Sequence, residues 1–229
     1  MTYPTWWFDK EKPWSPEDRP FVYPDWWVFT GDFWELKGDS TYCVTWPLKA
    51  KSVVVEVGSY RGVWLSWMLP RYNCHYWCIE PSPYSFKALE KVAAGHPKVH
   101  LCNFALWSED EKGTLCDIER DGANLFGGQG PTAEVELVDA VRFFRENKIR
   151  KVDLLSVNIE GAEFILLPYL IRKGLIKRVK NLMIQWHAEA REWKAELQVW
   201  KIRETLVPTH KMAWNLGAWE CWTRKGSNG

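Results

Sequence analysis

Apolar runs alternate with segments of helical periodicity along most of the chain beyond residue 50. Continuous apolar, β-branched runs predict strands buried on both faces, and segments with apolar residues at helical spacing or with capping signals predict helices. The predicted strands cover 51–58, 75–80, 98–106, 151–158 and 179–187. The predicted helices cover 63–71, 82–95, 162–174 and 189–206. The stretch 133–148 combines a short strand with a helix, and 109–113 and 121–130 are predicted turns.

This alternation of strands and helices favours an α/β fold with a doubly wound, mostly parallel sheet of the Rossmann-like kind. Two short strand-like runs within 210–225 meet near Leu216 and Gly217, which predicts a terminal antiparallel hairpin. We expect the main domain to cover residues 51–229, preceded by an N-terminal extension at residues 1–50.

The N-terminal extension is rich in aromatic residues. Seven of the chain's 17 tryptophans lie within its first 46 residues, interspersed with prolines and without a clear helical or strand period. One interpretation is an aromatic collar that packs on the main domain, since large aromatic side chains mostly serve packing. The alternative is a lid or wall of the substrate site, because indole faces stack on sugars and flat rings.

Composition and charge narrow the class of protein. Thirty basic and 29 acidic residues nearly cancel, which gives no general attraction to nucleic acid or to an anionic membrane. No apolar run approaches the roughly 20 residues needed to span a bilayer, and no signal peptide is visible. We therefore expect a cytoplasmic location. The six cysteines are then predicted to be reduced and mostly buried, and Cys74, His75 and Cys78 match no metal-site spacing.

Polar or small residues follow each of the five predicted strands. Open α/β sheets bind ligands at the carboxyl ends of their parallel strands, so these positions predict a binding site. Glycines in the segment that follows the first strand allow a tight turn and close approach of a ligand to the backbone. The residues that we expect to contact a cofactor are Glu56, Gly58, Ser59, Tyr60, Gly62, Glu80, Pro81, Ser82, Asn103 and Ala105.

Glu80 is central to the choice of cofactor. A carboxylate at the end of the second strand can accept hydrogen bonds from both hydroxyls of a ribose. A dinucleotide site prefers the spacing Gly-x-Gly-x-x-Gly, whereas this loop reads Glu56-x-Gly58-x-x-x-Gly62. The looser spacing disfavours a nicotinamide oxidoreductase and favours S-adenosylmethionine, which has no phosphate group.

Several of these motifs together resemble the FkbM-like family of S-adenosylmethionine-dependent methyltransferases. They are VVVEVGSYRG, CIEPSP, NFAL, VDLLSVNIEGAEFILLPYL and IQWH, in this order between about residues 52 and 187. The resemblance implies a methyltransferase fold and O-methylation of sugars or natural products. In the family, the first loop commonly reads Asp-x-Gly-Ala-Asn-x-Gly. This chain keeps an acid at Glu56 and both glycines, Gly58 and Gly62. The DGAN sequence at 121–124 is interpreted as a chance likeness in a loop.

The chain departs from the family pattern at the ends of the fourth and fifth predicted strands. The family commonly has Lys-x-Asp-x-Glu-Gly where this chain has Ser156, Asn158 and Glu160, and Glu-x-His where it has Gln185 and His187. We expect Asn158, Glu160 and His187 to be the catalytic residues and expect no metal ion, since divalent cations prefer anionic ligands. Glu163 is expected to stabilise the N-terminus of the following helix.

The function expected from these features is S-adenosylmethionine-dependent methyl transfer, with O-methylation of a small molecule or sugar hydroxyl. No nucleic acid or membrane partner is expected. The alternative is a non-catalytic binding module that keeps the methyltransferase fold but has lost acids at Asn158 and Gln185. Formation of a methylated product distinguishes the two.

Overall fold

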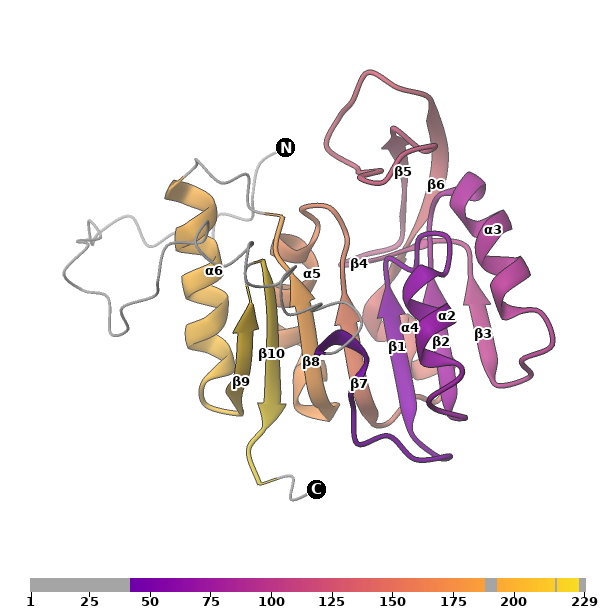
Figure 1. Ribbon diagram of the computed structural model, residues 1–229. Helices are drawn as coiled ribbons and strands as arrows, with labels where there is room; N and C mark the ends of the chain where they lie inside the picture. The colour runs from indigo at the N-terminus through magenta and orange to yellow at the C-terminus, as the bar shows by residue number, and fades with distance from the viewer. Residues whose placement is uncertain (1–41, 188–192, 217, 227–229) are drawn as a thin grey trace.

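A seven-stranded sheet forms the centre of the protein in the computed structural model, which describes residues 42–187, 193–216 and 218–226. The strand order is β3-β2-β1-β7-β8-β10-β9 (Figure 1). The strands are β1 (Val53–Val57), β2 (His75–Ile79), β3 (Val99–Cys102), β7 (Val152–Val157), β8 (Val179–Gln185), β9 (His210–Leu216) and β10 (Trp219–Arg224).

Strands β1, β2, β3, β7 and β8 pair in parallel, so their carboxyl ends meet at one edge of the sheet. β10 pairs antiparallel with both β8 and β9, with a bulge between Cys221 and Trp222. The fold class and the terminal hairpin predicted from the sequence are therefore confirmed.

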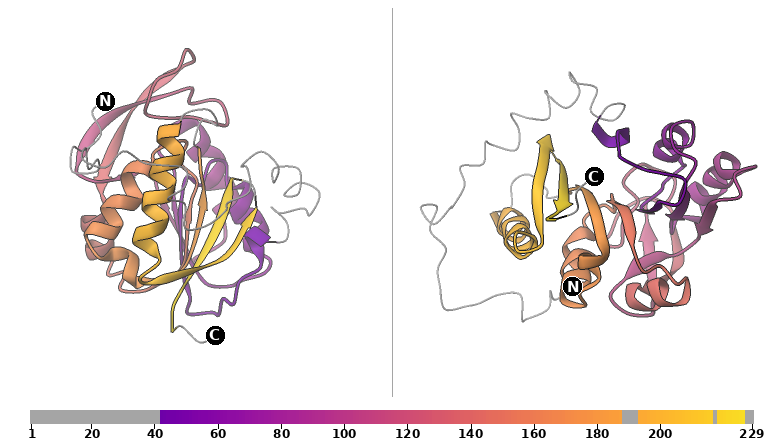
Figure 2. Two further views of the ribbon diagram at one scale, coloured as in Figure 1. Left: turned by 90° about the vertical axis from the view of Figure 1, so that its left-hand side faces the viewer. Right: turned by 90° about the horizontal axis from the view of Figure 1, so that it is seen from below.

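Helices cover both faces of the sheet, which gives three layers (Figure 2). One face carries α4 (Ala140–Glu146), α5 (Glu163–Arg172) and α6 (Trp193–Leu206); the other carries α2 (Val63–Met68), α3 (Pro83–Ala93) and the short 3₁₀ helix η4 (Tyr42–Val44). A second 3₁₀ helix, η5 (Leu175–Arg178), links α5 to β8. Because side chains alternate along a strand, Val54 joins the cluster under α2 and Val55 joins the opposite cluster.

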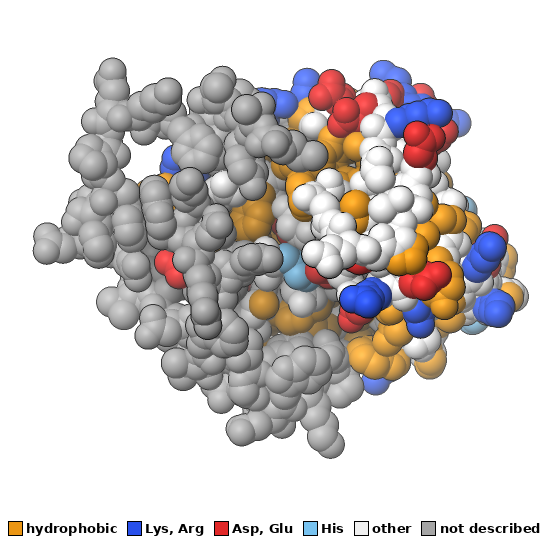
Figure 3. Space-filling view, turned by 90° about the horizontal axis from the view of Figure 1, so that it is seen from above, with side chains coloured by type: hydrophobic (Ala, Val, Ile, Leu, Met, Phe, Trp, Pro, Cys, Tyr) orange, Lys and Arg blue, Asp and Glu red, His pale blue; other side chains and the backbone are white. Residues whose placement is uncertain are grey.

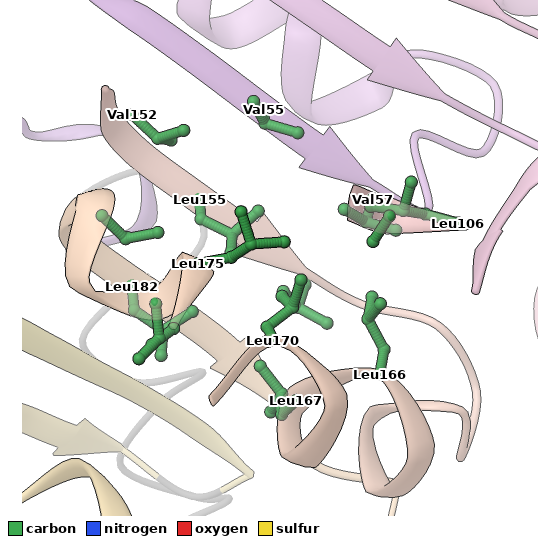
Figure 4. Close-up of a cluster of buried hydrophobic side chains, with 14 of the residues drawn as sticks. Val55, Val57, Leu106, Val152, Leu155, Leu166, Leu167, Leu170, Leu175 and Leu182 are labelled. Atoms are coloured by element: carbon green, nitrogen blue, oxygen red, sulfur yellow. The ribbon is translucent and has the colours of Figure 1, made fainter. Parts of the chain in front are cut away.

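The core between the sheet and α5 consists of branched aliphatic side chains. Leu155 of β7 faces Leu166 and Leu170 of α5, and all three are at most 1% exposed (Figure 4). Full burial of one leucine contributes roughly 1.5–3 kcal/mol relative to the exposed side chain. This packing fixes α5 on β7, and the turn between them carries two of the candidate catalytic residues, Asn158 and Glu160.

A second, three-stranded sheet rises above the carboxyl edge of the main sheet (Figure 1). Its strands are β4 (Ala105–Trp107), β6 (Thr132–Asp139) and β5 (Glu111–Cys116), in that order. The prediction of a single strand at 98–106 was therefore wrong, as was the prediction of a turn throughout 109–113. Asn103 lies between β3 and β4, and its amide donates to the backbone carbonyls of Glu80 and Pro81. The chain leaves the main sheet there and pairs with β6 instead.

Most of the predicted N-terminal extension lies outside the described residues. Of its last part, Cys43, Val44 and Trp46 are buried against the cluster under α2. The six cysteines are free thiols, five of them buried, as predicted. Over the described parts of the chain, every helix is too short or too polar to cross a membrane.

Candidate active site

Residues that follow β1, β2, β7 and β8 meet at the carboxyl edge of the main sheet, which Figure 3 shows from above. Two adjoining cavities open there. The first lies beneath the second sheet, and the second, which is larger, lies beside α2 and β10. The residues that line both are Gly58, Tyr60, Asp121, Gly122, Asn158 and Glu160. A ligand in one cavity would therefore meet a ligand in the other at these residues.

The loop after β1 requires glycine at position 58. Its φ of +87° is in the left-handed region, and a Cβ there would lie 1.8 Å from the backbone oxygen of Asn158. The N–H groups of Gly58 and Ser59 both donate to the carbonyl of Ile79, at 2.9 and 3.0 Å. The exits of β1, β2 and β7 are thus packed backbone against backbone, and a ligand can approach the loop closely.

Glu80 stands at the end of β2 with its carboxylate fixed by the backbone. Oε2 accepts the N–H of Tyr60 at 2.7 Å, and Oε1 accepts the N–H of Ser82 at 2.8 Å. Burial raises the pKa of Glu80 to about 7, although these two hydrogen bonds oppose the shift. The side chain lines the first cavity, and each oxygen keeps a lone pair for a ligand hydroxyl.

Glu56 is more deeply buried than Glu80 and lines the second cavity. It is 3% exposed, and its Oε2 atom is without a hydrogen-bond partner among the described residues. Burial raises the pKa of Glu56 to about 8. At neutral pH the side chain is therefore mostly a neutral carboxyl, and its buried, unpaired oxygen is costly unless a ligand supplies a hydrogen-bond partner.

The buried position of Glu56 predicts a pH-dependent effect on stability. Because its pKa is raised from 4.5 to about 8, its contribution to stability is lost as the pH rises between these values. Glu56→Gln should therefore raise the free energy of unfolding by several kcal/mol, on the order of 5, at pH 9 and by little near pH 4. Urea denaturation at both pH values measures this, and an equal gain at both would contradict it.

Glu163, the first residue of α5, organises the turn between β7 and α5. It is fully buried, and its carboxylate accepts the N–H groups of Ile159 and Gly161 at 2.8 and 2.9 Å. Glu160 and Gly161 have φ values of +51° and +95°, so the turn is held in a strained conformation for the non-glycine residue. Glu163 was predicted only to stabilise the N-terminus of this helix; its hydrogen bonds also hold the turn that places Glu160 at the cavities.

His187, two residues after β8, bridges the two carboxylates of this turn. Its Nδ1 lies 2.8 Å from Oε1 of Glu163, and its Nε2 lies 3.0 Å from Oε1 of Glu160. Burial alone would lower the pKa of His187, but the hydrogen bonds and charges of the two glutamates raise it to about 10. The ring is therefore an imidazolium at neutral pH, with both nitrogens donating.

This bridge predicts that stability falls at alkaline pH. A histidine whose folded pKa is about 10 stabilises the fold fully below its unfolded value near 6.5, and the contribution is lost as the pH rises through 10. Between pH 6.5 and 9.5, the wild type should lose about 2 kcal/mol more free energy of unfolding than His187→Gln. Urea denaturation of both proteins tests this, and parallel losses would show that the bridge contributes nothing.

The other expected site residues divide into two groups. Asn158 lines both cavities, and its buried Oδ1 is without a partner among the described residues. Pro81 and Ala105 line the first cavity, and Ser59 lines the second. Gly62, Ser82 and Asn103 line neither cavity: Gly62 starts α2, Ser82 caps α3, and Asn103 holds the exit of β2. The structure thus places these three as supports for the loops.

A flap formed by residues 117–130, between β5 and β6, was not predicted to be part of the site. Its residues 121–125 line the first cavity, so the DGAN sequence lies at the site although it was interpreted as a chance likeness. Arg61 donates to the carbonyl of Glu119 at 2.9 Å, and Ser82 donates to that of Ile118 at 2.9 Å. The glycines at 122, 127, 128 and 130 indicate a loop in the sequence. The sequence does not indicate that this loop lies over the first cavity.

Comparison with known proteins identifies the family. The model of the methyltransferase FkbM domain matches residues 56–210. The chain therefore belongs to the FkbM methyltransferase family, and its cofactor is S-adenosylmethionine. Among curated proteins, no sequence match was found.

Several solved structures are similar in fold. A provisionally assigned rRNA methylase from Clostridium thermocellum has a TM-score of 0.50 at 8% identity, over 84% of this chain and 97% of that one. Fibrillarin from Aeropyrum pernix, with natively bound S-adenosyl-L-methionine, has a TM-score of 0.47 at 9% identity, over 82% and 74%. Ribosomal protein L11 methylase from Lactobacillus delbrueckii subsp. bulgaricus has a TM-score of 0.44 at 18% identity, over 83% and 79%. At such identities, likeness concerns the fold alone.

The chemistry of the site fits this cofactor. Glu80 offers fixed acceptors for ribose hydroxyls, Gly58 leaves room for close approach, and the unpaired Oδ1 of Asn158 suits a cationic amino group. Over the described part of the chain, no cluster of three or more histidine, cysteine, aspartate or glutamate side chains is arranged to hold a metal ion.

Proposed function

We propose that this methyltransferase acts on a hydroxyl group of a small molecule or sugar. The observation that carries the proposal is the position of Glu160. It lines both cavities, and His187 holds it there by a hydrogen bond of 3.0 Å. A proton acceptor therefore stands where donor and acceptor would meet, which methyl transfer to a hydroxyl requires and simple binding does not.

On the donor side, the residues of the chain serve to position the cofactor. S-adenosylmethionine supplies a methyl group made electrophilic by its positively charged sulfur. Glu80 would hold the ribose in the first cavity, and Asn158 would bind the amino group at the boundary of the two cavities. Fixing two reactants at short distance is worth several kcal/mol in such a displacement.

On the acceptor side, Glu160 would take the hydroxyl proton as the oxygen attacks. Its Oε1 accepts from His187, while its Oε2 points toward the flap, 3.9 Å from where a Cβ on Gly122 would lie. His187 is unsuited to be the base itself, because its pKa of about 10 keeps both ring nitrogens protonated at neutral pH. We therefore assign proton transfer to Glu160 and its positioning to His187.

The lining of the second cavity is compatible with a sugar. Three tryptophans, Trp64, Trp67 and Trp219, offer indole faces, and Ser156 and Gln185 offer polar groups. Sugar rings stack on indoles through their apolar faces while their hydroxyls form hydrogen bonds. This cavity is the proposed acceptor site.

A mass-spectrometric screen tests the proposal. The purified protein is incubated with S-adenosylmethionine carrying a trideuterated methyl group, together with pools of hydroxyl compounds, glycans or RNA. We expect the label on a hydroxyl compound or glycan, at the same rate with and without a chelator. Binding of S-adenosylhomocysteine without any labelled product would favour the non-catalytic binding module. Label on RNA would contradict a small-molecule acceptor.

A further inference from the structure

The flap bridges two of the loops that surround the first cavity. Its residues 121–125 line this cavity, and the flap extends above the carboxyl edge of the main sheet (Figure 1). Arg61, in the loop after β1, donates to the carbonyl of Glu119 at 2.9 Å. The ring of Phe126 lies against the turn before α5, since a Cβ on Gly161 would lie 3.3 Å from its Cε2 atom. The flap is thus held from both the β1 loop and the β7–α5 turn.

Hydrogen bonds within the flap fix its own shape. Asp117 Oδ1 accepts the N–H of Gly130 at 2.8 Å, and a Cβ on Gly130 would lie only 2.3 Å from this oxygen. Cys116 and Asn124 exchange two backbone hydrogen bonds, of 2.8 and 3.2 Å. The side-chain oxygen of Asn124 accepts the N–H of Phe126 at 2.9 Å. A segment closed on itself in this way can move as one unit about its base.

Arg61 is prepared for its contact with the flap by aromatic neighbours on the main domain. Its guanidinium carbon lies 5.1 Å from the ring centroid of Tyr60 and 5.1 Å from that of Tyr84. The hydrogen bond from Arg61 to the flap is exposed to solvent, where water competes for both groups, so it can break and form again. The bond from Ser82 to Ile118 lies near the base of the flap and can stay in place when the rest moves.

We propose that the flap is a lid over the cofactor, that Arg61 is its latch, and that the cofactor enters and leaves while the latch is open. This inference rests on the proposed placement of the cofactor in the first cavity and does not depend on the identity of the acceptor. Asp121 and Gly122 of the flap line both cavities. The wall that faces the acceptor is therefore complete only once the flap has closed, so S-adenosylmethionine binds before the acceptor.

The kinetics of S-adenosylhomocysteine binding distinguish a lid from a fixed wall. A latch that closes the flap before and after binding slows entry and exit alike, whereas a contact in a fixed wall slows exit alone. Arg61→Gln should therefore raise the association and the dissociation rate constants by roughly tenfold each and change Kd by less than about threefold. Stopped-flow tryptophan fluorescence follows association, because Trp107 lines the first cavity. A chase of radiolabelled S-adenosylhomocysteine with excess unlabelled compound follows dissociation.

Two further variants make the comparison specific to the flap. Arg224→Gln removes an arginine-to-carbonyl bond of the same length, to Lys177, outside both cavities. It should leave both rate constants unchanged. Gly130→Ala places a methyl group against the carboxylate of Asp117 and so loosens the base of the flap without touching Arg61. It should raise both rate constants, as Arg61→Gln does.

Two results would overturn the lid. Faster dissociation of Arg61→Gln with unchanged association, and hence a weaker affinity, would make Arg61 part of a fixed wall. Unaltered rate constants in both Arg61→Gln and Gly130→Ala would show that the flap does not control entry. In that case Glu80→Ala separates two failures: a weakened affinity would leave the cofactor in the first cavity beneath a fixed flap, and an unaltered affinity would overturn the placement of the cofactor itself.

Discussion

Replacing Glu80 with alanine should weaken the binding of S-adenosylhomocysteine by a factor of about 100 or more. Each hydrogen bond lost from a buried ribose hydroxyl costs about 1–3 kcal/mol. The variant also removes the acceptor for the N–H groups of Tyr60 and Ser82, so the two loops around the cofactor lose their shared anchor. Isothermal titration calorimetry measures the affinity directly.

The matched control for this variant is Glu90→Ala, on the exposed side of α3. It should leave the affinity unchanged. Glu80→Gln keeps the size of the side chain but replaces one acceptor by a donor, so we expect an intermediate loss. Unaltered affinity in Glu80→Ala would show that the ribose binds elsewhere.

Replacing Glu160 with glutamine should lower kcat by a factor of about 1000 while S-adenosylhomocysteine affinity stays near that of the wild type. General base catalysis contributes roughly 100- to 10,000-fold, and glutamine of the same length cannot take a proton. His187→Gln should lower kcat less, because it loosens the position of Glu160 but leaves the carboxylate. Glu204→Gln, exposed on α6, is the control.

The pH profile separates the roles of the two residues. If His187 acts as the imidazolium that holds Glu160, the wild-type rate should be level through neutral pH and fall as the pH rises toward 10. A rate that keeps rising up to pH 10 would make His187 the base. Wild-type turnover in Glu160→Gln would remove the carboxylate from the reaction and leave positioning as the source of catalysis.

The main sheet could be predicted from the sequence because its strands are buried on both faces and read as unbroken apolar runs. The run around Val54 and Val55 and the run around Leu154 and Leu155 are examples. Parallel strands place their carboxyl ends at one edge of the sheet. The topology alone therefore predicted that Glu80 and Asn158 lie close together.

The second sheet and the flap could not be predicted. β5 is exposed at three of its six positions, contains Gly113 and lacks a strong apolar period. The break after β3 depends on contacts of Asn103 with residues more than 20 positions away. The bridge from His187 to Glu163, 24 residues apart, is likewise a product of tertiary structure. This bridge makes His187, one of the expected catalytic residues, an imidazolium, because a histidine between two carboxylates retains its proton.

A crystal structure with S-adenosylhomocysteine bound tests the assignment of the cofactor site most directly. We expect the ribose hydroxyls to lie within hydrogen-bond distance of the Glu80 carboxylate. We also expect the sulfur to lie at the boundary of the two cavities, facing Glu160, with the second cavity left open for the acceptor. A ribose bound away from Glu80, or a sulfur pointing away from Glu160, would contradict it.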